Sequence, residues 1–562
     1  MKRNLPVSIF AFIALIPMLF WLVQYLDQDM WWDEMISLKD FALVKASETI
    51  STYPDPNNHI LFNLINNGWT ALFGERDFYF WIHHPGSLRF LQWMIALGGI
   101  SYTFFVGKRF FDSSTGVIAA VLLSTTIPFL NFSMQLRGYN LSVLLTAAVL
   151  YHGWRFMRER TKIQLVMTIL MGSALLYTLP SNIYFLFSFG LISAIQGLRK
   201  KTPFDGTHGV SFVKQGYFQL GLALFGTVLL ALLLYSPVLD SVLHNRFVDK
   251  EPPSRGYAFT GLLWPIVSGF VSWRILLLFP LLIYIPSIRK QWIPKVDIEQ
   301  QHYGRAVQLI FFFLIPFLVS FLQGNKPFER TFVPLAPIFA LWWGFAIRQF
   351  MLRWETSFRS SFTLMGILSA YCLGTFFWQF SANQRIYAEA LDNNERLQNS
   401  YRSFYLHKGF QPAEAAQMVQ QAVKDDPGTV ILTDELDRVA LVFYLKDLGI
   451  ESWTTVKMKE AYHEKDGRSY THAGMLQKSN LKDKDVEYAN VSVSLATESE
   501  YAQKDLLPVM QMALQTTGDK RAYVLTAFPN KQNFIFNRYF QLGKVSKVGV
   551  ARDFTLYKVN VN

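Results

Sequence analysis

The sequence has 562 residues, of which 51% belong to the hydrophobic set and only 17% are charged. Globular proteins carry about 25% charged residues, so this composition excludes a purely soluble protein. The net charge is +12, yet the segment from Arg385 onward holds about 23 basic and 22 acidic residues. The basic excess therefore lies in the apolar first part of the chain, which indicates membrane topology and argues against nucleic-acid binding.

Apolar stretches of about 17 to 21 residues recur in the first 380 positions, and a helix of that length crosses roughly 30 Å of hydrocarbon. The first stretch follows a basic start, as in a signal peptide, but it is too long and no small-residue cleavage site follows, so we expect a retained helix. The predicted spans, about eleven in number, are residues 6–26, 87–106, 116–133, 140–157, 163–179, 181–198, 217–237, 274–288, 306–323, 332–348 and 362–380.

Basic residues between these spans predict the orientation of the chain. With the N-terminus in the cytoplasm, the basic clusters fall on the inner side, as the positive-inside rule requires. These clusters are Lys108/Arg109, Arg155/Arg158/Arg160/Lys162, Arg199/Lys200/Lys201, Arg289/Lys290/Lys295 and Arg348/Arg353/Arg359. Segment 257–273 is interpreted as an interfacial or re-entrant helix, because a further span there would reverse the later loops. The expected location is the plasma (inner) membrane.

The expected fold class is an α-helical polytopic membrane protein with a C-terminal soluble α/β domain. Residues 1–384 form the predicted membrane domain, with outer juxtamembrane helices at about 33–80. Residues 385–562 form the predicted extracytoplasmic domain, because helix-like windows alternate there with short β-rich runs. The windows are QPAEAAQMVQQAVKDD, ELDRVALVFYLKDLG and SEYAQKDLLPVMQMALQ, and the runs are GTVILTD, VSVSLAT, RAYVLTAF and DFTLYKV. The domain has no glycine-rich phosphate loop, which argues against a nucleotide-binding module.

The first outer segment opens with Asp29-Met30-Trp31-Trp32-Asp33-Glu34. A carboxylate at the membrane boundary, partly desolvated by indole rings, has a pKa raised toward the range of a general base. The structural alternative is that Asp33 caps a juxtamembrane helix, with Glu34 in its first turn and Trp31 and Trp32 at the headgroups. His59 follows in Asn57-Asn58-His59. It could donate a proton, bind a phosphate or ligate a metal, or it could cap a second helix with one ring nitrogen bonded to backbone.

Two later outer segments carry cations. In Gln135-Leu136-Arg137-Gly138-Tyr139 the guanidinium of Arg137 suits a pair of phosphate oxygens, although it could also extend to lipid headgroups. Lys326 and Arg330 lie in the outer loop NKPFERTFVP, against the positive-inside trend, and an anionic lipid phosphate is the expected partner. An internal pair with Glu329 is the structural alternative.

Taken in order, these motifs resemble the GT-C superfamily of membrane glycosyltransferases, specifically family 39 and dolichyl-phosphate-mannose-protein mannosyltransferase-like enzymes. The shared features are the acidic pair after the first span, the N-H-x-x-L helix start leading to LFGE, a Leu-Arg pair, the QLRGY turn and ERTFVPLAP. The likeness covers the first 150 or so residues and residues 324–345, and hardly touches the C-terminal domain. Where the family commonly has His-Pro-Pro, this chain has His59-Ile60-Leu61.

The resemblance implies an inverting enzyme that takes one sugar from a polyprenyl-phosphate donor and attaches it to a lipid, polysaccharide or protein acceptor outside the cytoplasm. It implies that Asp33 is the catalytic carboxylate, that Glu34 is its neighbour, and that Arg137 and Arg330 match two family arginines. Trp32, His59, Tyr139 and Lys326 complete the candidate substrate-binding set. No cofactor is required, although some relatives hold a divalent metal near the positions of Glu34 and His59.

The mechanism also follows from the chemistry of such a donor. Arg137, Arg330 and Lys326 would offset the charge that gathers on the departing phosphate. Asp33 would accept the proton of the attacking hydroxyl in a single displacement, and Glu34 would orient the acceptor or a metal. The competing interpretations are a lipid or sugar transporter, for which the sequence lacks an inverted repeat, and a non-catalytic membrane scaffold.

Overall fold

The computed structural model describes residues 7–54, 56, 58–198, 210–244, 254–285, 297–352, 354, 358–393 and 411–425, followed by shorter segments. These segments are residues 430–434, 443–445, 447–448, 456–457, 461–465, 468–472, 474–481, 484–491, 521–526, 543–551 and 554–561.

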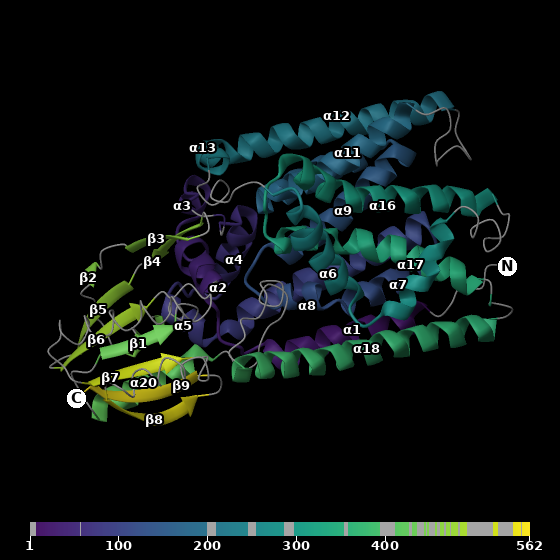
Figure 1. Cartoon of the computed structure of the whole chain (residues 1–562). Coiled ribbons are helices and arrows are strands. Elements are labelled where there is room, and N and C mark those ends of the chain that lie inside the picture. Colours follow the sequence, from purple (N-terminus) through teal and green to yellow (C-terminus); the bar gives the residue numbers. More distant parts are fainter. Residues whose placement is uncertain are drawn as a thin grey trace.

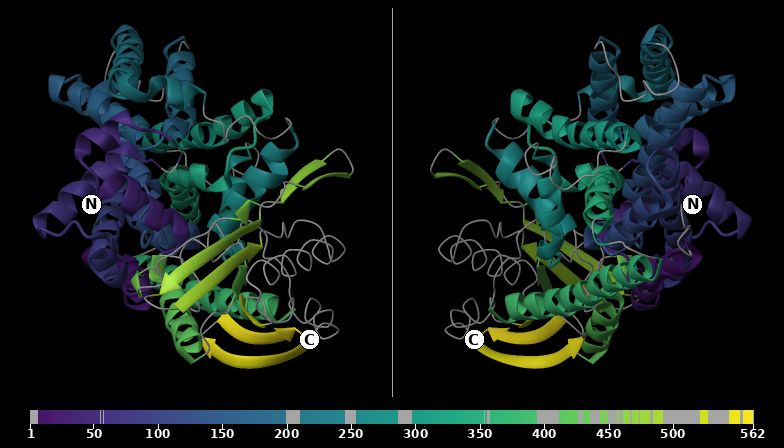
Figure 2. Two further views of the ribbon diagram at one scale, coloured as in Figure 1. Left: turned by 90° about the vertical axis from the view of Figure 1, so that its left-hand side faces the viewer. Right: turned by 90° about the vertical axis from the view of Figure 1, so that its right-hand side faces the viewer.

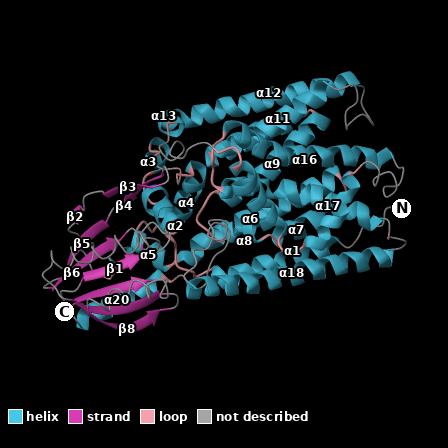
Figure 3. Ribbon diagram, in the orientation of Figure 1, coloured by secondary structure: helices cyan, strands magenta, loops and turns pink. Residues whose placement is uncertain are grey.

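Long helices form a bundle, and short helices together with a β-sheet lie at one of its ends (Figures 1 and 3). The bundle elements are α1 (Val7–Tyr25), α6 (Pro85–Phe110), α7 (Ser113–Ser124), α8 (Ile127–Phe132), α9 (Tyr139–Glu159), α10 (Lys162–Thr178), η2 (Pro180–Asn182), α11 (Ile183–Leu198), α12 (Val210–Tyr235), η3 (Ser236–Val238), α13 (Leu239–Leu243), η4 (Ala258–Leu263), α14 (Trp264–Val271), η5 (Ile275–Tyr284), α16 (Asp297–Gln323), η6 (Glu329–Leu335), α17 (Ala336–Leu352) and α18 (Phe358–Asn393).

Every predicted span coincides with at least one helix, so the expected helical membrane fold is confirmed. Five of the described helices are long and apolar enough to cross a membrane, or six if one bent pair forms a single span. Three shorter apolar helices belong to α1, α7 and α10. The number and direction of the crossings stay predictions. The predicted boundary at residue 384 lies inside α18, which continues to Asn393.

The bent pair comprises Ala258–Val271 and Ile275–Tyr284, which meet at 111°. This geometry suits either a broken span or a re-entrant loop, and segment 257–273 was expected to be interfacial or re-entrant. Arg274 lies at the bend and is fully buried. It donates to the Leu122 carbonyl (2.9 Å) and to the hydroxyl of Thr125 (2.8 Å), where α7 ends. These bonds satisfy the buried guanidinium and tie the bend to the centre of the bundle.

Helix α7 is the centre of the bundle, since its residues from Ser114 to Ser124 are all buried. Small residues allow its neighbour α6 to approach closely. A Cβ atom on Gly107 would lie 2.5 Å from the Cα of Gly116, a distance that no side chain tolerates. Small residues at such crossings are typical of helix packing in membranes, where close van der Waals contact drives association.

The segment between α1 and α6 folds into short helices: α2 (Trp32–Ile36), η1 (Ser37–Ala42), α3 (Ala46–Ser51), α4 (Ile60–Leu72) and α5 (Phe78–His83). They lie at the same end of the bundle as the sheet (Figures 1 and 2). Side-chain amides join them. Asn67 of α4 donates to the carbonyls of Ala42 (2.9 Å) and Val44 (2.6 Å), and Asn58 donates to the carbonyls of Thr49 and Thr52. Helices thus occupy most of residues 33–80, while their juxtamembrane position stays a prediction.

The C-terminal part contains helix α20 (Pro412–Asp425) and a seven-stranded sheet in the order β2-β5-β6-β1-β7-β9-β8, beside a two-stranded sheet β3-β4. The strands are β1 (Val430–Asp434), β2 (Val456–Lys457), β3 (Ala461–Lys465), β4 (Arg468–His472), β5 (Gly474–Leu481), β6 (Lys484–Val491), β7 (Arg521–Thr526), β8 (Gly543–Ala551) and β9 (Phe554–Val561). Strand β1 is parallel to β6 and β7, and the other pairs are antiparallel. The expected α/β character of this part is therefore confirmed.

Three of the four predicted β-rich runs form β1, β7 and β9, and QPAEAAQMVQQAVKDD forms α20. Most of the run VSVSLAT, and the predicted helix SEYAQKDLLPVMQMALQ, lie outside the described residues. The two end views show the sheet on one side of the bundle end and the N-terminal short helices on the other (Figure 2).

Candidate active site

Asp33 lies between two arginines at the end of the bundle that faces the sheet. It is the second residue of α2 and its side chain is only 3% exposed. Its Oδ2 atom lies 3.5 Å from Nη2 of Arg137 and 3.8 Å from Nη2 of Arg330. Trp31, not Asp33, is the N-cap residue of α2, so the capping role considered for Asp33 is wrong. The structure thus brings Asp33 together with Arg137, about 100 positions later in the sequence, and with Arg330, about 300 positions later.

Arg137 is buried with part of its hydrogen-bonding capacity unused. Within the part of the chain that the structure describes, its Nε and Nη1 atoms have no hydrogen-bond partner. The guanidinium lies 5.7 Å from the centre of the Tyr139 ring, in a cation-π contact. Buried N–H groups are nearly always paired in folded proteins, and each unpaired one costs about 1–3 kcal/mol. An arginine that carries two such atoms is therefore arranged for an acceptor with several oxygens.

Arg330, on the first turn of η6, contacts the same Asp33 oxygen as Arg137. Its guanidinium lies 4.5 Å from the centre of the Phe328 ring and next to the phenol of Tyr139. Its side chain is 19% exposed, against 2% for Arg137, so Arg330 forms the accessible edge of the site. Its Nε atom, like Nε and Nη1 of Arg137, has no hydrogen-bond partner among the described residues.

His59 supports the turn that carries Arg137. Its Nδ1 accepts a hydrogen bond from the backbone N–H of Gly138 (2.9 Å), and its ring meets Tyr139 edge-on at 5.3 Å. Burial, together with the charges of Arg137 and Arg330, holds the pKa of His59 well below its ordinary value. The ring is therefore neutral at physiological pH and adds no charge to the site. Bonding of one ring nitrogen to backbone agrees with the structural alternative considered for this residue.

Gly138 is required by this close approach. A Cβ atom there would lie 2.9 Å from Cγ2 of Thr178 and 3.0 Å from Nδ1 of His59. We expect Gly138→Ala to lower the free energy of unfolding by about 1–3 kcal/mol, because both neighbours lie in packed surroundings. Thermal unfolding in detergent measures this. Gly221→Ala is the matched control, since a Cβ there meets nothing within 4 Å; equal melting temperatures for the two variants would contradict the prediction.

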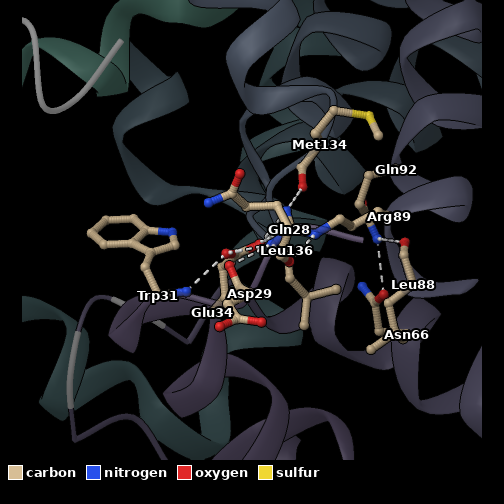
Figure 4. A network of polar contacts seen from close by, with 10 residues as sticks. All are labelled: Gln28, Asp29, Trp31, Glu34, Asn66, Leu88, Arg89, Gln92, Met134 and Leu136. Atoms are coloured by element: carbon tan, nitrogen blue, oxygen red, sulfur yellow. Dashed lines mark hydrogen bonds and ion pairs between the residues drawn. The ribbon is translucent and has the colours of Figure 1, made fainter. Parts of the chain in front are cut away.

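Glu34, the second acid, belongs to a separate and internally neutral ion pair with Arg89 of α6 (Figure 4). Its Oε1 accepts from Arg89 Nη1 (3.2 Å) and from the Leu136 backbone N–H (2.8 Å), and its Oε2 accepts from Arg89 Nη2 and from Trp31 N–H. Arg89 also donates to the carbonyls of Gln28, Asp29 and Met134. The pair joins α6, the 28–34 segment and the turn before α9.

The sequence predicts that Glu34 orients the acceptor or binds a metal, and it predicts no role for Arg89. A signal was present, because an arginine inside a predicted membrane span usually faces a partner. The contacts of Glu34 with Arg89 and of His59 with Gly138 leave neither residue arranged as a metal ligand. Among the described residues, no three His, Cys, Asp or Glu side chains lie together in a way that could hold a metal ion.

Two other candidates keep the status of predictions. Trp32 is the first residue of α2, but its side chain lies outside the described part of the structure. Lys326 is half-buried in the loop between Gly324 and η6, four positions before Arg330. The structure gives contacts with Asp33 for Arg137 and Arg330.

Comparisons with known proteins give structural similarity only. No family model and no curated protein matches the sequence. Among solved structures, the chain is similar to ArnT from Cupriavidus metallidurans bound to undecaprenyl phosphate, with 13% identity and a TM-score of 0.47 over 98% of this chain and 97% of that one.

It is also similar to the archaeal oligosaccharyltransferase AglB from Archaeoglobus fulgidus in complex with an inhibitory peptide and a dolichol-phosphate. There the identity is 10% and the TM-score 0.45 over 98% of this chain and 73% of that one. Both TM-scores lie below 0.5, so these similarities assign no function to this chain.

Proposed function

We propose that this chain is an inverting glycosyltransferase that moves a single sugar from a polyprenyl-phosphate donor to an acceptor on the extracytoplasmic side of the plasma (inner) membrane. In this proposal the N-terminus is cytoplasmic, residues 1–384 form the catalytic membrane domain, and residues 385–562 form an extracytoplasmic domain. The observation that carries it is the buried carboxylate of Asp33 between the guanidinium groups of Arg137 and Arg330.

The charges of this site match the reaction. Asp33 and the two arginines together carry +1, while the Glu34–Arg89 pair is neutral and His59 is uncharged. A polyprenyl-phosphate sugar is a phosphodiester with one negative charge. After transfer, the leaving polyprenyl phosphate approaches two negative charges, and a protonated Asp33 leaves the two arginines at +2. These three residues and the phosphate therefore sum to zero charge in both states; the buried Glu329 carboxylate, which also acts on Arg330, lies outside this sum.

In the proposed reaction an acceptor hydroxyl oxygen attacks the anomeric carbon from the face opposite the phosphate. The bond between that carbon and the phosphate oxygen breaks, and its electron pair stays on the phosphate. Asp33 takes the hydroxyl proton as general base. Arg137 and Arg330 interact more strongly with the leaving phosphate than with the donor, because its charge has grown, and this difference lowers the barrier.

An apolar cavity of about 380 Å³ supports a lipid-linked donor. It lies between η4, α14, η5, α16 and α17, and its lining includes Trp264, Phe313, Phe339 and Trp342. Trp264 is largely exposed on the side of the bundle. Phe339 lies about 15 Å further along η6 and α17 than Arg330, from the rises of the two helix types. A lipid tail whose phosphate binds Arg330 is long enough to reach this cavity.

The experiment supplies purified protein with hexosyl and pentosyl undecaprenyl phosphates carrying a radiolabelled sugar, together with lipid, polysaccharide and peptide acceptors. We expect label on one acceptor class and an equal amount of free undecaprenyl phosphate, with inversion at the anomeric carbon. A second assay, in reconstituted vesicles, measures movement of the labelled donor across the bilayer and so distinguishes a transferase from a transporter. Movement of labelled donor across the bilayer without any transfer would refute the proposed function and favour the transporter interpretation.

A further inference from the structure

The C-terminal part contacts the outer segment through several described side chains. Oδ2 of Asp29 accepts a hydrogen bond from the backbone N–H of Ala413 (2.8 Å), in the first turn of α20. Asp447 lies 2.7 Å from Nε2 of His83, and the Tyr444 hydroxyl donates to the Ile82 carbonyl (3.3 Å). The Asp29 contact reaches the segment that carries Asp33, as does Tyr444, which also hydrogen-bonds the Met30 backbone; the Asp447–His83 contact lies at the end of α5.

Asp29 connects α20 to the Glu34–Arg89 pair. Figure 4 shows Asp29, Glu34 and Arg89. The Asp29 carbonyl accepts from Nη2 of Arg89 (3.1 Å), and Arg89 is bound to both carboxylate oxygens of Glu34. Glu34 in turn accepts from the backbone N–H of Leu136 (2.8 Å), the residue before Arg137. A continuous series of hydrogen bonds thus runs from α20 to both sides of the Asp33–Arg137 contact.

The charge of Asp29 suits this position. Burial raises its pKa to about 6, while the Ala413 N–H and the charge of Arg89 act in the opposite direction. Asp29 is therefore mostly ionised at neutral pH. A carboxylate at the N-terminus of the 14-residue helix α20 is stabilised by the helix dipole and by its unpaired N–H groups.

We propose that Asp29 and Arg89 are positioning residues through which helix α20 of the C-terminal part holds Asp33 and Arg137 in their relative placement. The inference rests on the proposed function for its catalytic consequence, although the structural link is independent of it. A displacement of about 1 Å in a catalytic site lowers the reaction rate strongly. A contact that fixes the turn before Arg137 therefore affects turnover without touching substrate.

The test compares four variants. Asp29→Ala removes the acceptor of the Ala413 N–H, and Asp29→Asn retains an oxygen there. Asp447→Ala removes a different carboxylate of the same interface, the one that contacts His83, and leaves the Asp29–Arg89 link intact. Asp240→Ala is the surface control, because the Asp240 side chain is 94% exposed on α13. For each variant, hydrogen exchange of residues 133–138 is measured together with kcat and the donor KM.

We expect roughly tenfold faster exchange in residues 133–138 for Asp29→Ala, the effect of one lost charged hydrogen bond. We expect kcat to fall about tenfold with a nearly unchanged donor KM, and Asp29→Asn to recover most of both. Asp447→Ala and Asp240→Ala should match the wild type. Unchanged exchange in Asp29→Ala, or an equal change in Asp447→Ala, would overturn the inference. Absence of sugar transfer by the wild type would refute the proposed function alone, since the exchange measurement still decides the positioning role.

Discussion

Replacement of Asp33 by asparagine is expected to lower the rate of sugar transfer by about 10² to 10⁴, the usual contribution of a well-placed general base. Asparagine has nearly the same shape and keeps an oxygen that accepts from Arg137 and Arg330, but it does not take up a proton from the acceptor. Donor binding should stay the same or become tighter, because the two guanidinium groups no longer have a carboxylate 3.5 and 3.8 Å away that competes with the phosphate.

Single-turnover transfer rates and binding of undecaprenyl phosphate, measured on the same preparation, separate these effects. Asp240→Asn serves as the control for the loss of a carboxylate, since the exposed Asp240 side chain pairs only with the nearby His244 among the contacts described. Thermal unfolding tests the fold, because the substitution leaves two buried cations without their carboxylate partner. An Asp33→Asn protein that is folded, binds the lipid and transfers sugar at the wild-type rate would exclude Asp33 as the base.

Hydropathy was sufficient to locate the bundle helices, because a membrane-crossing helix must be apolar along its whole length. Hydropathy could not show where these helices are interrupted or bent. Arg274, at the 111° bend before η5, is hydrogen-bonded to the end of α7, about 150 positions earlier in the chain, and hydropathy carries no information on such a distant contact. Strands such as β8, in the sequence GKVSKVGVA, escaped prediction because alternating polar and small residues at a sheet edge resemble a loop.

The candidate site was predictable where it depends on topology alone. Asp33, Arg137 and Arg330 each follow or precede an apolar span on the same predicted side, so their placement at one end of the bundle follows from counting spans. The roles of neighbours were not predictable. Adjacent acids suggested a joint function for Asp33 and Glu34, but consecutive residues in a helix point in different directions. Only the structure shows that Glu34 faces Arg89 and Asp33 faces Arg137.

Replacement of Arg137 by glutamine is expected to lower kcat by about 10²-fold, comparable to the loss of one oxyanion-stabilising donor. The donor phosphodiester carries one negative charge and the leaving phosphate nearly two, so the missing guanidinium weakens the transition state more than the bound donor. The donor KM should therefore rise by a smaller factor than kcat falls. Arg137→Lys keeps the charge but loses the paired N–H groups, and an intermediate kcat is expected.

Arg76→Gln is the matched control for Arg137→Gln, because Arg76 is an exposed arginine of the same outer layer and its guanidinium contacts Thr70 and Asn67. The two site variants should also differ from each other: Asp33→Asn loses rate without losing donor affinity, whereas Arg137→Gln loses both. If Arg137→Gln lost only thermal stability and kept the wild-type kcat, Arg137 would be a structural partner of Asp33. Phosphate binding would then have to depend on Arg330, whose guanidinium lies 3.8 Å from the Asp33 carboxylate.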